Sequence, residues 1–243
     1  MNRLVFAVAL LAPAVCAAQM PASALPEIVT DRPGFGESSA VVARGTLQIE
    51  SGVSLEDSRA AHRTDAAGQL LGRIGVAPRV ELRVGVDGSD AEIGGKVKLA
   101  DASRAGVDVA VIPYVSLPAE DAGGRAHDPG FKVAASADLP RGFGLSGTFN
   151  AADARGDTRR AWQRELSVSL GHALSTRLAA YGEADGTFAG RRCACSIDGG
   201  VTTAVGRNAQ VDVEAGRGLD GPVQEWFVGA GLVFRTPLRA RRR

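Results

Sequence analysis

The sequence lacks any later hydrophobic run long enough to cross a bilayer as a helix. Such a helix needs about 20 consecutive, mostly apolar residues, and every segment after the N-terminal one is shorter than that. An excess of one charge sign is also missing, because 28 Lys and Arg residues face 27 Asp and Glu residues. We therefore expect no nucleic acid partner, since such partners are bound through basic patches.

Motifs for catalysis and for metal binding are missing as well. The sequence has no Gly-x-Ser-x-Gly, so a serine hydrolase would lack its nucleophile elbow. His62, His127 and His172 stand alone, without a second ligand at a metal-binding spacing. No nucleophile, base and orienting group come together. We predict neither an enzyme nor a bound cofactor.

Cysteine is scarce, with three residues in the whole chain. Cys193 and Cys195 form a Cys-x-Cys pair in an expected outer loop, with no further metal ligands nearby. An exported protein can form disulfides. The pair is therefore either a local disulfide or two unpaired thiols, and both interpretations stay open.

The N-terminus has the layout of a secretory signal peptide. Arg3 is followed by an apolar run over residues 4–15 and by the small residues Ala17 and Ala18. The run is too short for a transmembrane helix. We predict that residues 1–18 are a signal peptide cleaved after Ala18. Cys16 would permit a lipoprotein, but Val15 stands where that processing requires a small residue.

Alternation of apolar and polar residues is the strongest pattern in the remaining chain. Residues 79–87, for example, read RVELRVGVD. The same period of two occurs in residues 46–55, 91–99, 131–139 and 209–216. On a helix these apolar residues would scatter around the axis, whereas on a strand they share one face. The 31 glycines also disfavour long helices. The pattern predicts an all-β fold.

About twelve strands are expected, near 44–57, 69–77, 79–87, 91–99, 106–117, 129–139, 142–151, 160–170, 176–188, 197–205, 209–216 and 225–234. Links after even-numbered strands are tight, and most links after odd-numbered strands are longer. An even strand number with this alternation of links is typical of an antiparallel outer-membrane β-barrel with both termini in the periplasm. We assign residues 44–235 to the barrel, 19–43 to a periplasmic or plug-like segment and 236–243 to a basic tail.

The polar faces of the strands should line the lumen, because a barrel in lipid shows its apolar side chains outward. The candidate lumen residues are Glu50, Glu81, Arg83, Lys96, Lys98, Lys132, Asp138, Glu165, Asp212 and Glu214. Asp31 and Arg32 are candidate plug contacts, with a turn set by Pro33 as the alternative. Twelve strands predict a narrow, partly obstructed channel. Aromatic residues, at 5%, leave only a thin interfacial girdle.

Two stretches resemble a known family. Residues 30–53 read TDRPGFGESSAVVARGTLQIESGV, and residues 198–235 read DGGVTTAVGRNAQVDVEAGRGLDGPVQEWFVGAGLVFR. Both are similar to the outer-membrane transporter-like family associated with the meta-pathway of phenol degradation. The matching positions are Asp31, Arg32, Pro33, Gly45, Gln48, Glu50, Gly52, Asn208, Gln210, Asp212, Gly216, Phe227, Gly229, Gly231 and Phe234. The resemblance implies an outer-membrane barrel that passes small hydrophobic or aromatic compounds. This chain departs from the family by continuing past its terminal strand to Arg243.

Three hypotheses for function follow. The first is a passive outer-membrane channel for a small solute, with outer-membrane lipid and the barrel-assembly machinery as partners. The second is a plugged structural or binding barrel without transport. The third is an exported soluble β-sandwich, which membrane fractionation would separate from the other two.

Overall fold

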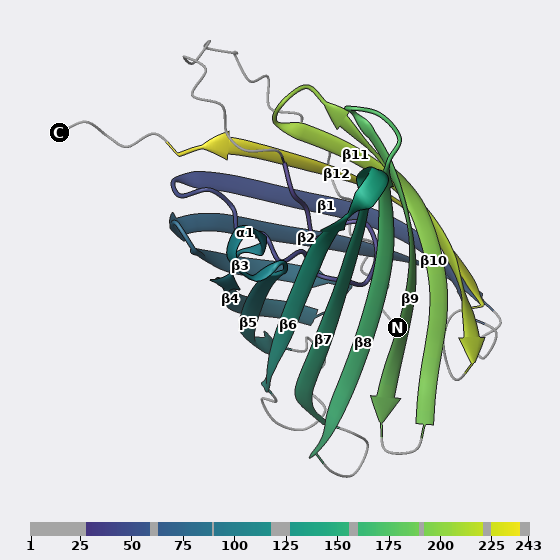
Figure 1. Cartoon of the computed structure of the whole chain (residues 1–243). Helices are drawn as coiled ribbons and strands as arrows, with labels where there is room; N and C mark the ends of the chain where they lie inside the picture. Colours follow the sequence, from purple (N-terminus) through teal and green to yellow (C-terminus); the bar gives the residue numbers. More distant parts are fainter. Residues whose placement is uncertain are drawn as a thin grey trace.

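A computed structural model describes residues 28–58, 63–88, 90–117, 127–155, 160–189, 192–220 and 225–238. Its twelve strands form one closed antiparallel barrel, in which each strand pairs with its neighbours in sequence (Figure 1). The first strand, β1 (Thr46–Ser58), pairs with the last, β12 (Trp226–Pro237), and closes the ring. Closure removes exposed strand edges. The predicted twelve-stranded barrel is confirmed, and the β-sandwich hypothesis is wrong.

The strands between these two have the following bounds. They are β2 (Arg63–Ala77), β3 (Val80–Asp87), β4 (Asp90–Ala100), β5 (Asp108–Leu117), β6 (Asp128–Leu139), β7 (Phe143–Arg155), β8 (Arg160–Ala173), β9 (Leu178–Ala189), β10 (Arg192–Val205) and β11 (Ala209–Asp220). A short helix α1 (Ala102–Ala105) connects β4 to β5, and a 3-10 turn η1 (Pro140–Gly142) connects β6 to β7. No helix in the described residues is long and apolar enough to cross a membrane.

We call the end at which β1 leads into β2 the outer end, and the opposite one the inner end. Several strands, among them β2, β7, β10 and β11, extend further toward the outer end than the alternation predicted. β2 already begins at Arg63, and β7 continues to Arg155. The links at the outer end are therefore mostly short, contrary to expectation. The reason is that backbone pairing within each hairpin continues beyond the apolar part of the strands, where side chains no longer alternate.

The same extension corrects two boundaries. The Cys-x-Cys pair lies in β10 and not in a loop, and Cys195 pairs in register with Gly186. Cys195 is disulfide-bonded, whereas the side chain of Cys193 lies outside the described residues, as does the predicted signal peptide. The last strand ends at Pro237, two residues beyond the expected end of the barrel. Of the predicted basic tail, residues 239–243 lie outside the described part.

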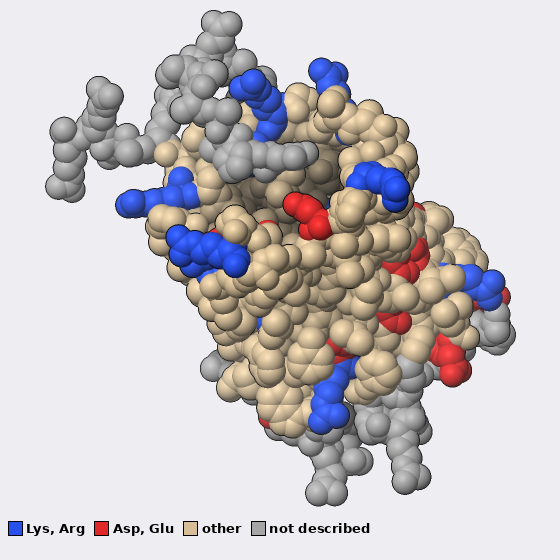
Figure 2. Space-filling model, in the orientation of Figure 1, with Lys and Arg blue, Asp and Glu red and all other residues tan. Residues whose placement is uncertain are grey.

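The two faces of each strand differ sharply in burial. On β3, Leu82 and Val84 are 54% and 56% exposed, while Glu81 and Arg83 are 0% and 3% exposed. Residues other than Lys, Arg, Asp and Glu, drawn in tan, make up most of the surface seen in Figure 2. Burying charge inward and presenting apolar side chains outward suits a barrel whose outer surface is in lipid.

Residues 28–43 precede β1 and contain no regular secondary structure. Within them, Asp31 contacts Arg83 of β3, and the next residue, Arg32, contacts Asp212 of β11. The strands β3 and β11 lie four strands apart in the closed ring of twelve, and Glu183 of β9, which accepts the backbone N–H of Phe35, lies on the side opposite β3. The segment therefore crosses the lumen, and we call residues 28–43 the lumen segment.

Candidate functional site

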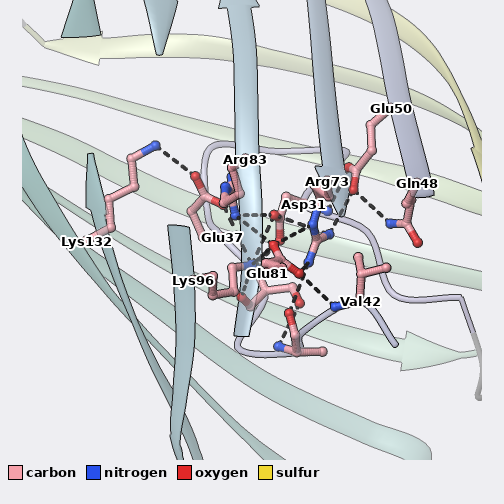
Figure 3. A network of polar contacts seen from close by, with 12 residues as sticks. Asp31, Glu37, Val42, Gln48, Glu50, Arg73, Glu81, Arg83, Lys96 and Lys132 are labelled. Atoms are coloured by element: carbon pink, nitrogen blue, oxygen red, sulfur yellow. Dashed lines mark hydrogen bonds and ion pairs between the residues drawn. The ribbon is translucent and has the colours of Figure 1, made fainter. Parts of the chain in front are cut away.

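The carboxylate of Asp31 lies among three cations from neighbouring strands. Its Oδ2 is 2.6 Å from Nη1 of Arg83 and 3.3 Å from Nη1 of Arg73, and its Oδ1 is 2.9 Å from Nζ of Lys96 (Figure 3). Oδ1 also accepts the backbone N–H of Ser38 at 2.8 Å. Charge-assisted hydrogen bonds of this kind are stronger than neutral ones. Asp31 is thus the main anchor of the lumen segment on this wall.

A second carboxylate of the lumen segment, Glu37, extends this network. Its Oε2 lies 2.7 Å from Nη2 of Arg83, and its Oε1 lies 2.8 Å from Nζ of Lys132 on β6. Burial disfavours the charged form of Glu37, but the surrounding Arg and Lys side chains outweigh that effect. The pKa of Glu37 is therefore held well below its usual value. Both carboxylates share the guanidinium of Arg83.

Two acids of the wall complete this side. Glu50 and Glu81 bind Arg73, each with an N···O distance of 2.8 Å, and all three side chains are fully buried. They also accept backbone N–H groups of the lumen segment, Glu50 from Asp31 at 2.9 Å and Glu81 from Val42 at 2.7 Å. Since an irregular segment cannot pair its own backbone, these bonds satisfy donors that burial would otherwise leave unpaired.

Arg32 makes the corresponding contacts on β11, which lies four strands from β3 around the ring. Its Nη2 lies 3.2 Å from Oδ1 of Asp212 and 3.3 Å from Oε1 of Glu214, both on β11, and its Nη1 donates to the side chain of Gln69. Glycine makes room for the guanidinium, because a Cβ at Gly52 would lie 2.3 Å from Cζ of Arg32. The wall is thus shaped around this side chain.

Backbone groups of the lumen segment add to the contacts on the acidic side. The N–H of Gly34 donates to Oε2 of Glu214, and the N–H of Phe35 donates to Oε2 of Glu183 on β9, both at 2.8 Å. The ring of Phe35 meets that of Phe227 edge to face, with centroids 5.6 Å apart. Donors of the segment therefore meet acceptors of this wall along several consecutive residues.

The lumen is consequently polarised across its width. Arg83, Lys96 and Lys132 on one side receive the carboxylates of the lumen segment, while Asp212 and Glu214 on the other receive its guanidinium. Adjacent residues of the segment, Asp31 and Arg32, carry opposite charges to two separate parts of the wall. The arrangement binds charged groups, and no cluster of His, Cys, Asp and Glu in the described residues is suited to a metal ion.

A cavity of about 700 Å³ lies on the outer side of the lumen segment, whose residues from Asp31 to Glu37 contribute to its lining. Its wall carries the acidic residues Glu56, Asp87, Asp90, Glu92, Asp128, Glu165, Asp185 and Glu214. The cations that line it are Arg32, Arg83 and Lys132, and each of them is in an ion pair that involves the lumen segment. The cavity is an acidic vestibule.

The family of this chain follows from comparison with known protein families. The family model described as "Putative MetA-pathway of phenol degradation" matches residues 30–236. The chain belongs to this family. The sequence positions that carry the resemblance include Asp31, Arg32, Gly52 and Asp212, which meet at the site. The family motif thus includes contacts between the lumen segment and the barrel.

Solved structures with the same fold are outer-membrane barrels. The NanC porin is 11% identical, with a TM-score of 0.54, over 77% of this chain and 98% of that one. The KdgM porin in complex with disordered oligogalacturonate is also 11% identical, with a TM-score of 0.55 and the same coverage. The CymD monoaromatic hydrocarbon channel is 9% identical, with a TM-score of 0.50, over 83% of this chain and 90% of that one. No curated protein matches the sequence.

The residues singled out from the sequence fall into two groups in this family member. Seven of the ten candidate lumen residues contact the lumen segment directly: Glu50, Glu81, Arg83, Lys96, Lys132, Asp212 and Glu214. The other three lie elsewhere. Glu165 accepts from Asn150 in the vestibule wall, Lys98 binds Asp101 and Asp108 near the inner end, and Asp138 is exposed there.

Sequence reasoning did not single out three important members of the site. Arg73 could have been found, since it lies on the polar side of β2 in register with Arg83 of β3. Glu183 likewise faces inward from β9. Glu37 had no such signal, because the lumen segment has no periodicity.

Proposed function

We propose that this protein is an outer-membrane channel for small molecules whose lumen is closed at rest by residues 28–43. One observation carries the proposal: within five residues of the segment, Asp31 binds Arg83 of β3, Arg32 binds Asp212 of β11, and Phe35 binds Glu183 of β9, the strand opposite β3. A segment held in this way obstructs the passage, and its release would clear it. The porins and channels with the same fold support a role in passage.

The family description points to a solute class. A family associated with phenol degradation and a fold shared with a monoaromatic hydrocarbon channel favour small aromatic compounds. We propose passive passage without enzymatic activity, after removal of the signal peptide and insertion by the barrel-assembly machinery.

The gate can be tested by cross-linking the lumen segment to the wall. Oγ of Ser39 lies 2.6 Å from Oγ of Ser136 on β6, so Ser39→Cys with Ser136→Cys should form a disulfide. In planar bilayers the oxidised variant should stay closed, and reduction should restore the conductance of the unmodified protein. The unmodified protein with and without reductant is the control, because it contains a disulfide at Cys195. Equal conductance of the oxidised and reduced variants would refute the gate.

The second candidate is a permanently plugged binding barrel. It is favoured by the completeness of the ion pairing around Asp31 and by the open vestibule, which could receive a ligand without transport. Liposome swelling separates the two. A folded, reduced protein that admits no solute of any size supports the plugged barrel.

A further inference from the structure

The lumen segment places its charged groups on the wall as a bound solute would, and this observation indicates the chemical class of the solute. Resting on the proposed release of the segment, we propose that the solute admitted by this channel is a small zwitterion. Its carboxylate takes the place of Asp31 at Arg83 and Lys96, and its ammonium takes the place of Arg32 at Asp212 and Glu214.

The cationic wall, formed by Arg83 and Lys96, requires an anion once the lumen segment leaves. Among the described carboxylates Arg83 would retain Glu81, at 3.7 Å, in place of two within 2.7 Å. Lys96 would lose Asp31 and the carbonyl of Ser38, and would keep only Glu81 at 4.0 Å. Arg73 differs, because its ion pairs with Glu50 and Glu81 belong to the wall itself. The unmet positive charge is therefore concentrated at Arg83 and Lys96.

The acidic wall, formed by Asp212 and Glu214, requires a cation once the lumen segment leaves. Asp212 and Glu214 would lose the guanidinium of Arg32, and Glu214 would also lose the N–H of Gly34. Even with the segment in place, Oδ2 of Asp212 has no hydrogen-bond partner among the described residues, although the residue is 3% exposed. This wall thus has spare capacity to accept hydrogen bonds.

Removing one partner from a buried ion pair is strongly unfavourable, because the remaining charge is left without compensation. A neutral aromatic solute would leave the charges of both walls uncompensated. A solute that is only an anion or only a cation would leave the charges of one wall uncompensated. A solute with both charges compensates both walls, as the lumen segment does. An aromatic zwitterion would also agree with the solute class suggested by the family.

The acidic vestibule supports the same solute from outside. Its three lining cations are engaged with the lumen segment, so its field attracts the positive end of a solute. A simple anion would be repelled there before it reached Arg83. A zwitterion can enter with its ammonium group leading and then place its carboxylate on the cationic wall.

The test uses four probes that share one substituted benzene ring: 4-(aminomethyl)benzoate, 4-methylbenzoate, 4-methylbenzylamine and 4-methylbenzyl alcohol. Binding is measured by calorimetry, and uptake by liposomes, with the full-length protein and with the variant Asp31→Asn/Arg32→Gln. This variant leaves every wall residue and Glu37 intact but removes the two charges, of Asp31 and Arg32, whose places the solute would take. We expect the variant to bind and admit the zwitterion at least tenfold better than each other probe, and the unmodified protein to bind it more weakly.

Heat-modifiable gel mobility verifies folding, and three outcomes overturn the proposal. If the alcohol is bound and admitted as well as the zwitterion, the proposed channel function is retained, but its polarised lumen does not select solutes by charge. If either singly charged probe equals the zwitterion, only one wall binds solute. If the folded variant admits none of the four probes, the proposed channel function fails, and the zwitterion proposal fails with it.

Discussion

Replacing Asp31 with asparagine should open the channel while leaving the barrel intact. The change keeps the size of the side chain and the acceptor for the Ser38 N–H, but it removes the charge that faces Arg83, Lys96 and Arg73. Lys96 would then keep the carbonyl of Ser38 at 2.7 Å, but its nearest described carboxylates would be those of Glu37 and Glu81, each at 4.0 Å. The closed state should therefore lose stability, while the open state, with residue 31 in water, should hardly change.

The size of the effect follows from the contacts that are lost. A hydrogen bond to a charged group contributes about 1.5–3 kcal/mol, and removing one partner of a buried pair costs about 3–5 kcal/mol. Because Glu37 still compensates Arg83, we expect the closed state to lose about 2–3 kcal/mol, which lies within the first of these ranges. Since about 1.4 kcal/mol corresponds to a tenfold change in an equilibrium constant, the open state should gain a factor of about 30–140.

Single-channel recording in planar bilayers measures this directly as open probability at neutral pH. The matched control is Asp65→Asn, because Asp65 forms its 2.7 Å ion pair with Arg63 on the exposed outer part of β2. Exposed pairs contribute little, so the control should behave as the unmodified protein. An open probability of Asp31→Asn within threefold of that control, for protein shown to be folded, would refute the reasoning.

Three further predictions concern pH, packing and lipid. The pKa of Glu37 is held below its ordinary value of 4.5, so the stabilisation that Glu37 gives the closed state is complete above pH 4.5 and is lost as the pH falls through the lowered pKa. Conductance should therefore rise on acidification, and it should rise less in Glu37→Gln. Gly52→Ala should displace Arg32 and raise open probability, whereas Gly68→Ala, where a Cβ meets nothing within 4 Å, should not. Val84→Arg places a charge on the outer face and should lower the free energy of unfolding in vesicles by about 2–4 kcal/mol, measured by urea titration.

The sequence by itself determined the class of fold and the two faces of the wall. The period of two in RVELRVGVD is a local property, because each strand must separate lipid from lumen on its own. For this reason Glu81 and Arg83 could be assigned to one face, and Leu82 and Val84 to the other, before any pairing was known. Strand ends were less predictable, since backbone pairing continues where side chains no longer alternate, as at Cys195 in β10.

Only the tertiary structure decided which inward side chains meet and what closes the lumen. Asp31 binds Lys96, 65 residues away, and Arg32 binds Asp212, 180 residues away. Such pairings depend on the register accumulated around the closed ring and on the path of residues 28–43, which have no periodicity to reveal it. Charge balance across a lumen is a property of the closed barrel as a whole. The separation of cations and acids onto different parts of the wall therefore exists only once β1 meets β12.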